Sequence, residues 1–172
     1  RIITFSDTPD LRPTPDRVRE TLFNWLQLHI TGARCLDLFA GSGILGLEAL
    51  SRGASSVTAV ELDTRAAASI RQQTGLLHTS QLAVVQENVS SWLSRPCPGP
   101  RFDVVFLDPP YASRLQGPCC QLLADGTWLN PGALIYLEAA EPLETLVLPT
   151  GWTLARSKRA ADVHYGICKT AG

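Results

Sequence analysis

Methionine is absent from the chain, and no apolar run approaches the roughly 20 residues that a membrane-spanning helix needs. We therefore expect no membrane partner, and no secretory signal peptide is recognisable. Charge of one sign is also lacking, because 15 Lys and Arg against 16 Asp and Glu give a net charge of −1. Such a balance supplies no general attraction for nucleic acid, so a nucleic-acid partner would have to be held by a local basic patch.

The cysteines and histidines show no grouping typical of a metal site. The five cysteines lack Cys-x-x-Cys spacing, and His29, His78 and His164 are isolated in the sequence. We predict no metal, no disulfide framework and no catalytic histidine, and the odd cysteine count favours a reducing, cytoplasmic location. Adjacent Cys119 and Cys120 are interpreted as small packing residues.

Strand-like runs alternate with amphipathic helical segments through a chain of 172 residues, a length that suits a single domain and a monomer. The predicted strands are Arg34–Phe39, Val57–Glu61, Leu82–Gln86, Phe102–Leu107, Gly132–Glu138, Trp152–Arg156 and Val163–Cys168. The predicted helices are Ile44–Arg52, Thr64–Leu77, a short one through Trp92, and Leu115–Ala124. Residues 157–162 are short enough to join the last two strands as an antiparallel hairpin. The fold class is therefore α/β: a doubly wound, mostly parallel seven-stranded sheet with one antiparallel strand.

A glycine motif follows the first of these strands. The run Cys35-Leu36-Asp37-Leu38-Phe39-Ala40-Gly41-Ser42-Gly43-Ile44-Leu45-Gly46 reads as a strand, a G-x-G-x-x-G turn and a helix. The pattern fits a dinucleotide site, a nucleoside site or a purely structural turn. Asp37 favours the nucleoside site, because a carboxylate repels a pyrophosphate but suits the ammonium and sulfonium of S-adenosylmethionine. The predicted donor-binding residues of this segment are Asp37, Phe39, Ala40, Gly41, Ser42 and Gly43.

Further donor contacts are expected after the second and third strands. Glu61 lies 20 positions after Gly41, where Rossmann-like units place an acid that binds ribose hydroxyls, and Leu62 adjoins it. Asn88 and Val89 border the expected adenine position; Asn88 contacts the base or only caps the next helix. Asp63 is predicted to cap the helix that begins at Thr64.

The fourth strand ends in Asp108-Pro109-Pro110-Tyr111, at the carboxyl edge where open α/β sheets bind ligands. A structural turn explains the prolines but not the acid and the aromatic residue that flank them. An exocyclic amine of a nucleobase needs acceptors for its hydrogens before it can attack a methyl group, and Asp108 with a carbonyl of Pro109 or Pro110 can supply them. Tyr111 can stack on the base. We predict that these four residues are catalytic.

An arginine-rich segment precedes the first strand. Thr14, Pro15 and Asp16 indicate a helix start, with Thr14 as N-cap and Pro15 at the first helical position. Arg12, Arg17 and Arg19 near this start either form a solvated face or bind RNA phosphates. Residues 1–30 are expected to form a loop and a helix that border the site.

Four blocks resemble the RsmD-type bacterial 16S ribosomal RNA guanine-N2 methyltransferases. They are Arg12-Pro13-Thr14-Pro15-Asp16-Arg17-Val18-Arg19-Glu20-Thr21-Leu22-Phe23, Leu36-Asp37-Leu38-Phe39-Ala40-Gly41-Ser42-Gly43, Gly46-Leu47-Glu48-Ala49-Leu50-Ser51-Arg52-Gly53 and Asp108-Pro109-Pro110-Tyr111. The resemblance implies a class I methyltransferase fold, S-adenosylmethionine as donor, and a guanine of small-subunit RNA, in an assembling subunit, as target. It also implies that Asp37, Gly41, Gly43 and Glu61 line the donor site and that Asp108 and Tyr111 face the base.

One departure concerns the beginning of the chain. Members of this family usually carry a basic, glycine-containing hairpin after an opening like Arg1-Ile2-Ile3, whereas Thr4 here runs straight into Phe5-Ser6-Asp7. Together with the missing methionines, this suggests the hypothesis that a segment is left out of the sequence. Without the hairpin, RNA would be held by Arg12, Arg17, Arg19 and the predicted turn that contains Lys158 and Arg159.

Two further classes fit the same motifs. An adenine-N6 methyltransferase of DNA or RNA could use the same acid-Pro-Pro-aromatic turn, because that turn suits any planar exocyclic amine. A catalytically inactive donor-binding module would keep the glycine loop, although an intact Asp108-Pro109-Pro110-Tyr111 argues against it. A small-molecule methyltransferase is disfavoured because the chain has no extra insertion to enclose a small substrate.

Overall fold

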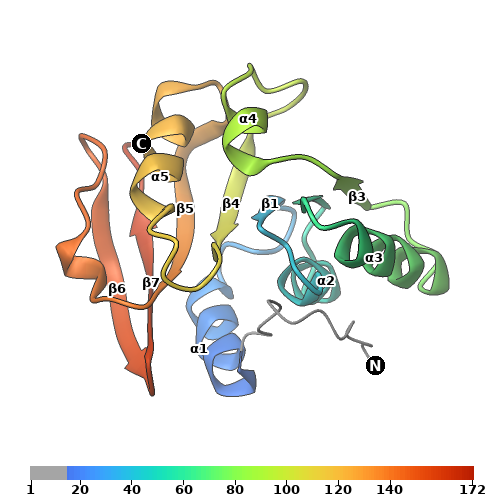
Figure 1. The fold of residues 1–172 in the computed structure, drawn as a ribbon, viewed down its shortest axis with the longest axis horizontal. Helices are drawn as coiled ribbons and strands as arrows, with labels where there is room; N and C mark the ends of the chain where they lie inside the picture. Colours follow the sequence, from blue (N-terminus) through green and yellow to red (C-terminus); the bar gives the residue numbers. More distant parts are fainter. Residues whose placement is uncertain (1–14) are drawn as a thin grey trace.

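The computed structural model describes residues 15–172, so the predictions for Arg1–Thr4, Arg12 and Thr14 lie outside the described residues. A mixed sheet of seven strands in the order β3-β2-β1-β4-β5-β7-β6 forms the centre of the molecule (Figure 1). The strands are β1 (Arg34–Leu38), β2 (Ser56–Val60), β3 (Leu82–Val85), β4 (Phe102–Leu107), β5 (Leu129–Ala139), β6 (Thr153–Ala160) and β7 (Val163–Lys169). Only the pairings of β7, with β5 and with β6, are antiparallel among these strands. The predicted fold class is confirmed.

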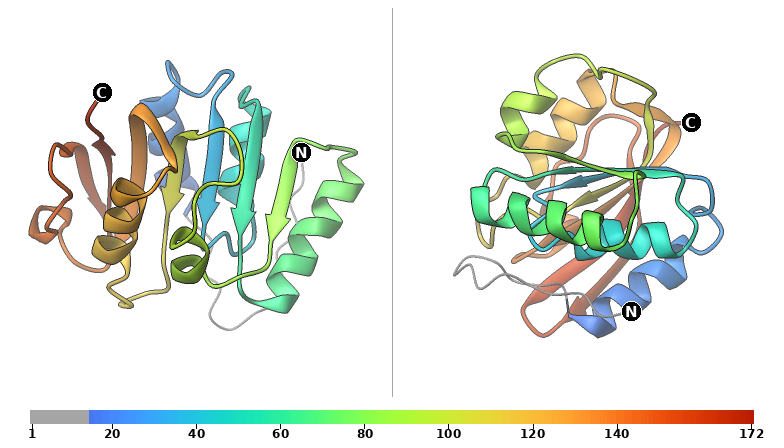
Figure 2. Two further views of the ribbon diagram at one scale, coloured as in Figure 1. Left: turned by 90° about the horizontal axis from the view of Figure 1, so that it is seen from above. Right: turned by 90° about the vertical axis from the view of Figure 1, so that its right-hand side faces the viewer.

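Helices cover both faces of this sheet (Figure 2). They are α1 (Asp16–Leu26), α2 (Ile44–Ser51), α3 (Thr64–Leu76), α4 (Val89–Leu93), α5 (Gln116–Asp125) and the 3₁₀ helix η1 (Leu143–Thr145). Residues of α1, α2 and α3 share one buried apolar cluster with the sheet, and residues of α4, α5 and η1 share the other. Among residues 15–172, no helix has the length and apolar character to cross a bilayer.

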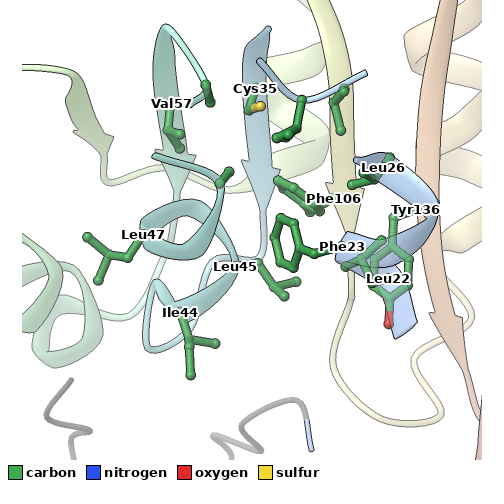
Figure 3. Packing of buried hydrophobic residues seen from close by; sticks show 14 of the residues in the cluster. Leu22, Phe23, Leu26, Cys35, Ile44, Leu45, Leu47, Val57, Phe106 and Tyr136 are labelled. Atoms are coloured by element: carbon green, nitrogen blue, oxygen red, sulfur yellow. The ribbon is translucent and has the colours of Figure 1, made fainter. Parts of the chain in front are cut away.

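The cluster on the α1 face is built from aromatic and aliphatic side chains of α1, α2 and the central strands (Figure 3). Leu22 and Phe23 are fully buried, and the ring of Phe23 lies 5.9 Å from that of Phe106 on β4. On the other face, the Trp92 and Trp128 rings lie 4.4 Å apart. Cys119 and Cys120 are buried there as free thiols, which confirms their interpretation as packing residues.

At some element boundaries the structure differs from the prediction because a single residue has a backbone angle that ends or delays the element. Phe39 was expected to end the first strand, but its φ of +59° turns the chain out of the extended conformation after Leu38. Pro15 was expected at the first helical position, and this is wrong: its ψ of 145° makes it the residue before α1. Asp63 caps α3 as predicted, since its carboxylate accepts a hydrogen bond from Ala66 N.

Gly46 is required by the contact between α2 and the sheet. A Cβ at this position would lie 2.9 Å from Val57 Cγ1 and 3.4 Å from Asp37 Oδ2. We expect Gly46→Ala to destabilise the fold by about 1–3 kcal/mol through overpacking, offset in part by about 1 kcal/mol from the higher helix propensity of alanine. Urea unfolding measures the difference in the free energy of unfolding between this variant and the wild-type protein.

Gly75 in α3 is the matched control, because it also lies in a helix but a Cβ there would meet nothing within 4 Å. Gly75→Ala is expected to raise the free energy of unfolding by about 0.5–1 kcal/mol. Equal changes in the free energy of unfolding of Gly46→Ala and Gly75→Ala would contradict the close-packing role of Gly46.

Candidate functional site

The carboxyl ends of β1, β2, β3 and β4 meet at one edge of the sheet, and all predicted donor-binding and catalytic residues except Asp37 follow these strand ends. Asp37 lies within β1, one residue before its end. At a strand end the chain leaves the ladder, so backbone groups and side chains there are available to a ligand. The edge is built by four different loops, which only the sheet order brings together.

The loop after β1 is a tight left-handed turn. Gly41 and Gly43 have φ angles of +59° and +79°, a region in which residues with a Cβ are strained. Gly43 N donates to Ala40 O at 2.8 Å, and Ala40 N donates to Val60 O at 3.0 Å, which ties the turn to β2. Ser42 and Ala40 are buried. The glycines therefore permit the backbone geometry that the sequence predicted for close approach to a ligand.

Asp37 lies beneath this loop with 2% of its surface exposed. Its carboxylate accepts a hydrogen bond from Gly46 N at 3.2 Å, which joins β1 to the first turn of α2. Burial raises the pKa of this carboxyl well above its usual range, while the Gly46 hydrogen bond opposes the shift. Asp37 thus orders the loop, and a contact with the cationic groups of a donor stays a prediction.

Glu61, at the end of β2, holds the loop from the other side. Its Oε1 accepts from Gly41 N at 2.7 Å, and its Oε2 accepts from Asp63 N at 2.8 Å. Each carboxylate oxygen keeps a further lone pair, so the side chain can also accept from ribose hydroxyls. The neighbouring Leu62 is 60% exposed at this edge.

Asn88 caps a helix after β3. Its Oδ1 accepts from Ser91 N at 3.0 Å, so the capping alternative is confirmed, while a contact with adenine stays a prediction. Val89, which follows it, is buried in the cluster with Trp92. The capped helix start thereby fixes the Asn88 amide at the edge of the sheet.

Asp108-Pro109-Pro110-Tyr111 follows β4 directly, and its turn is strained. Ala112 and Arg114 both have a φ of +59°, which is uncommon for residues with a Cβ and typical of functional turns. Ser113 N donates to the Pro110 carbonyl at 3.0 Å, which favours the Pro109 carbonyl as the acceptor for a substrate amine. Pro109 is buried, whereas the Tyr111 side chain is 55% exposed and accessible to a base.

Glu138 is a site residue that the sequence analysis did not single out. Leu107 pairs with Leu137, so Asp108, the first residue after β4, and Glu138, near the end of β5, each follow a member of this pair. Their carboxyl groups are hydrogen-bonded to each other, which requires a proton between them. Burial raises the pKa of Asp108 well above its usual range, and the charges of Glu138 and then Asp37 raise it further. The signal in the sequence that could have identified Glu138 is its position as a charged residue at the end of the apolar run Ile135-Tyr136-Leu137.

Four of the predicted basic residues lie among the described residues, and one expectation about them is wrong. Arg17 and Arg19 are in the first turn of α1, and Arg19 donates to Asp16 at 2.6 Å. Lys158 and Arg159 were predicted in a turn, which is wrong: both lie in β6, and only residues 161–162 separate it from β7. A turn is not needed to expose these two side chains, because β6 is an edge strand whose side chains face solvent.

The described residues also form an open pocket of about 340 Å³ at the opposite edge, near the starts of β1 and β4. Ala33, Asp103 and Gly132 are among its lining residues, and none of the predicted site residues contributes to it. The Asp103 carboxylate there accepts from Arg34 N and Asn130 Nδ2, so it is already engaged in joining strands. This pocket therefore does not belong to the site at the carboxyl edge.

Comparisons with known proteins agree with this geometry. The model of the family described as conserved hypothetical protein 95 matches residues 1–169. Ribosomal RNA small subunit methyltransferase D of Haemophilus influenzae is 46% identical over 157 residues, which cover 90% of this chain and 81% of that protein. Among solved structures, an Escherichia coli protein named "Putative methyltransferase yhhF" superposes with a TM-score of 0.87 at 42% identity, covering 95% of this chain and 90% of that one.

A more distant structure shares the fold alone. It is described as a putative methyltransferase complexed with SAH, with a TM-score of 0.70 and 16% identity over 90% of this chain and 48% of that one. The architecture of the sheet is therefore that of class I methyltransferases.

Proposed function

Because the chain belongs to the family of conserved hypothetical protein 95, we propose that it is a guanine-N2 methyltransferase of small-subunit ribosomal RNA. The methyl donor is S-adenosylmethionine, whose sulfonium supplies an electrophilic methyl group. The observation that carries the proposal is the position of Asp108-Pro109-Pro110-Tyr111 beside the glycine loop at the carboxyl edge. Residues 1–172 act as one domain in this proposal, and the adenine-N6 and inactive-module alternatives are not favoured.

The residues at the edge fit a nucleoside donor. Gly41 and Gly43 form the turn that lets backbone approach the ligand, and Glu61 holds Gly41 N while retaining acceptor capacity for ribose hydroxyls. Asn88 and Leu62 border the adenine in this proposal, and the buried Asp37 supplies a carboxyl acceptor beneath the loop.

The acceptor side of the reaction is assigned to Asp108 and the Pro109 carbonyl. They accept the two N2 hydrogens of guanine, which directs the nitrogen lone pair toward the methyl group. When the new N–C bond forms and the S–C bond breaks, N2 becomes cationic and one of its protons passes to Asp108. A raised pKa makes this carboxylate a better acceptor for that proton. Tyr111 stacks on the base and holds it at the edge.

Ribosomal RNA is held by basic residues around the same edge. Lys158 pairs with Tyr165, which itself pairs with Glu138, so the β6–β7 hairpin borders the catalytic edge. Arg17 and Arg19 supply further positive charge from the first turn of α1. We propose that these residues with Arg159 contact phosphates, that the protein acts as a monomer, and that an assembling subunit in the cytoplasm is the substrate.

The test is methyl transfer from labelled S-adenosylmethionine to unmodified small ribosomal subunits, naked ribosomal RNA and duplex DNA, followed by nucleoside mass analysis. We expect N2-methylguanosine from a ribosomal substrate, with more product from the subunits than from naked RNA. N6-methyladenine would establish the adenine alternative instead. Tight donor binding without transfer to any of the three would establish the inactive module.

The rate should depend on pH through Asp108. Methyl transfer needs the carboxylate form, and the pKa of Asp108 is raised by burial, Glu138 and Asp37. Turnover at saturating substrate is therefore expected to fall as pH drops through a value well above the range in which an ordinary aspartate titrates. Removing the neighbouring charge with Glu138→Gln should shift this acidic limb to lower pH. A shift in the opposite direction would contradict the assignment.

A further inference from the structure

Two carboxyl groups, Asp108 and Glu138, lie side by side at the carboxyl edge, although the reaction proposed above uses only one of them. Leu107 pairs with Leu137 in parallel register, and each acid is the next residue along its chain: Asp108 directly after β4 and Glu138 near the end of β5. Only 7% of the Glu138 surface is exposed. Burying a carboxyl group is energetically costly, and this one lies next to the residue that accepts the substrate amine. Glu138 can therefore reach the same base.

The surroundings hold Glu138 in place. Gln116 Nε2 donates to the Glu138 backbone carbonyl at 2.8 Å, which fixes the strand end against α5. Two residues earlier, the Tyr136 side chain is directed toward the carboxyl edge (Figure 3). Burial and then the charges of Glu138 and Asp108 raise the pKa of its hydroxyl, so this side chain lies beside both carboxyl groups. Tyr136, Asp108 and Glu138 therefore form one polar cluster at this edge.

Guanine offers a hydrogen-bonding edge that two acceptors match. Its N1–H and N2–H groups are adjacent donors, whereas adenine presents the N6–H donor beside N1, which is an acceptor. A carboxylate opposite an N1 acceptor would bring lone pairs together and leave both groups unpaired, which is costly in a desolvated site. Two carboxylates in adjacent positions thus distinguish guanine from a base that lacks the N1 hydrogen.

We propose that Glu138 determines specificity by accepting the N1–H of the target guanine while Asp108 accepts an N2–H. This inference rests on the proposed guanine-N2 methylation. The two base donors replace the proton that joins the carboxyl groups in the free protein, and that proton is released to solvent. Glu138 keeps its hydrogen bond to N1 throughout, and no bond to it forms or breaks during methyl transfer.

The experiment compares two ribosomal substrates that differ at one nucleotide. One carries guanosine at the position that the wild-type protein methylates, and the other carries 2-aminopurine, which keeps the N2 amine but has an N1 acceptor. The wild-type protein should prefer guanosine in kcat/KM by at least about 10²-fold. Glu138→Gln, whose amide can donate to N1, should lower this preference to below about tenfold.

Controls separate specificity from folding and from the reaction itself. Glu138→Ala should lower kcat/KM for guanosine by a larger factor than kcat/KM for 2-aminopurine. Glu48→Gln on α2, where the carboxylate pairs with Arg52, should keep the wild-type preference. Variants that lose activity on both substrates by the same factor would overturn the role of Glu138 while leaving guanine methylation intact. A wild-type protein without activity on guanosine would instead overturn the proposed function, and the inference with it.

Discussion

Asp108→Ala is expected to lower kcat for methyl transfer by about 10³-fold while S-adenosylmethionine affinity stays within about twofold of wild type. The carboxylate accepts a hydrogen from the amine and takes up positive charge only as the new bond forms, so its interaction belongs to the transition state. Removing one preorganised electrostatic partner of this kind costs about 10²–10³-fold, and loss of a proton acceptor adds to it. The glycine loop, which we assign to donor binding, is held by Glu61 and not by Asp108.

Single-turnover kinetics with the RNA substrate and calorimetry with the donor measure the two effects separately. Asp108→Asn should be intermediate, because its amide oxygen can accept a hydrogen bond but carries no charge. Asp125→Ala is the control, since Asp125 is an exposed carboxylate at the end of α5. An Asp108→Ala protein with wild-type turnover would remove this residue from the mechanism.

Glu61→Ala is expected to weaken donor affinity by about 1.5–3 kcal/mol, or roughly 10- to 150-fold, through loss of a charge-assisted hydrogen bond. The same carboxylate accepts from Gly41 N and Asp63 N, so its removal also leaves two backbone groups at the edge without this partner. We therefore expect a lower free energy of unfolding as well, by about 1–2 kcal/mol. Calorimetry gives the affinity and urea unfolding gives the stability.

Asp63→Ala separates these two effects. Asp63 caps α3 through Ala66 N, and loss of a helix cap costs about 1 kcal/mol of stability. This variant should bind the donor as well as the wild-type protein does. If Glu61→Ala bound the donor equally well, the assignment of the β2 end to the ribose would be wrong.

Local signals in the sequence predicted the backbone of the fold. Alternation of apolar strands with amphipathic helices predicted every strand of the described sheet, and β4 matches residue for residue. The Asp63 cap was also predictable, because capping depends on residues only three positions apart. Boundaries moved where a single backbone angle decided them, as at Phe39 and Pro15.

Interactions between distant residues were not predictable in the same way. The β6–β7 hairpin was predicted with a longer connection, because Lys158 and Arg159 on an edge strand resemble loop residues in composition. Glu138 follows an apolar strand 30 positions after Asp108, and nothing local relates the two. Their contact depends on the parallel register of β4 and β5.

The sequence by itself determined the α/β class, the glycine turn and the acid-Pro-Pro-aromatic turn, since these depend on periodicity and on residues close together in the chain. Only the tertiary structure decided which acids share an environment. Asp37, Glu61, Asp108 and Glu138 come from four strands, and the sheet order brings their ends to one edge. Burial and the charge of neighbouring acids then raise the pKa of Asp37 and Asp108, and both causes depend on neighbours that are remote in sequence.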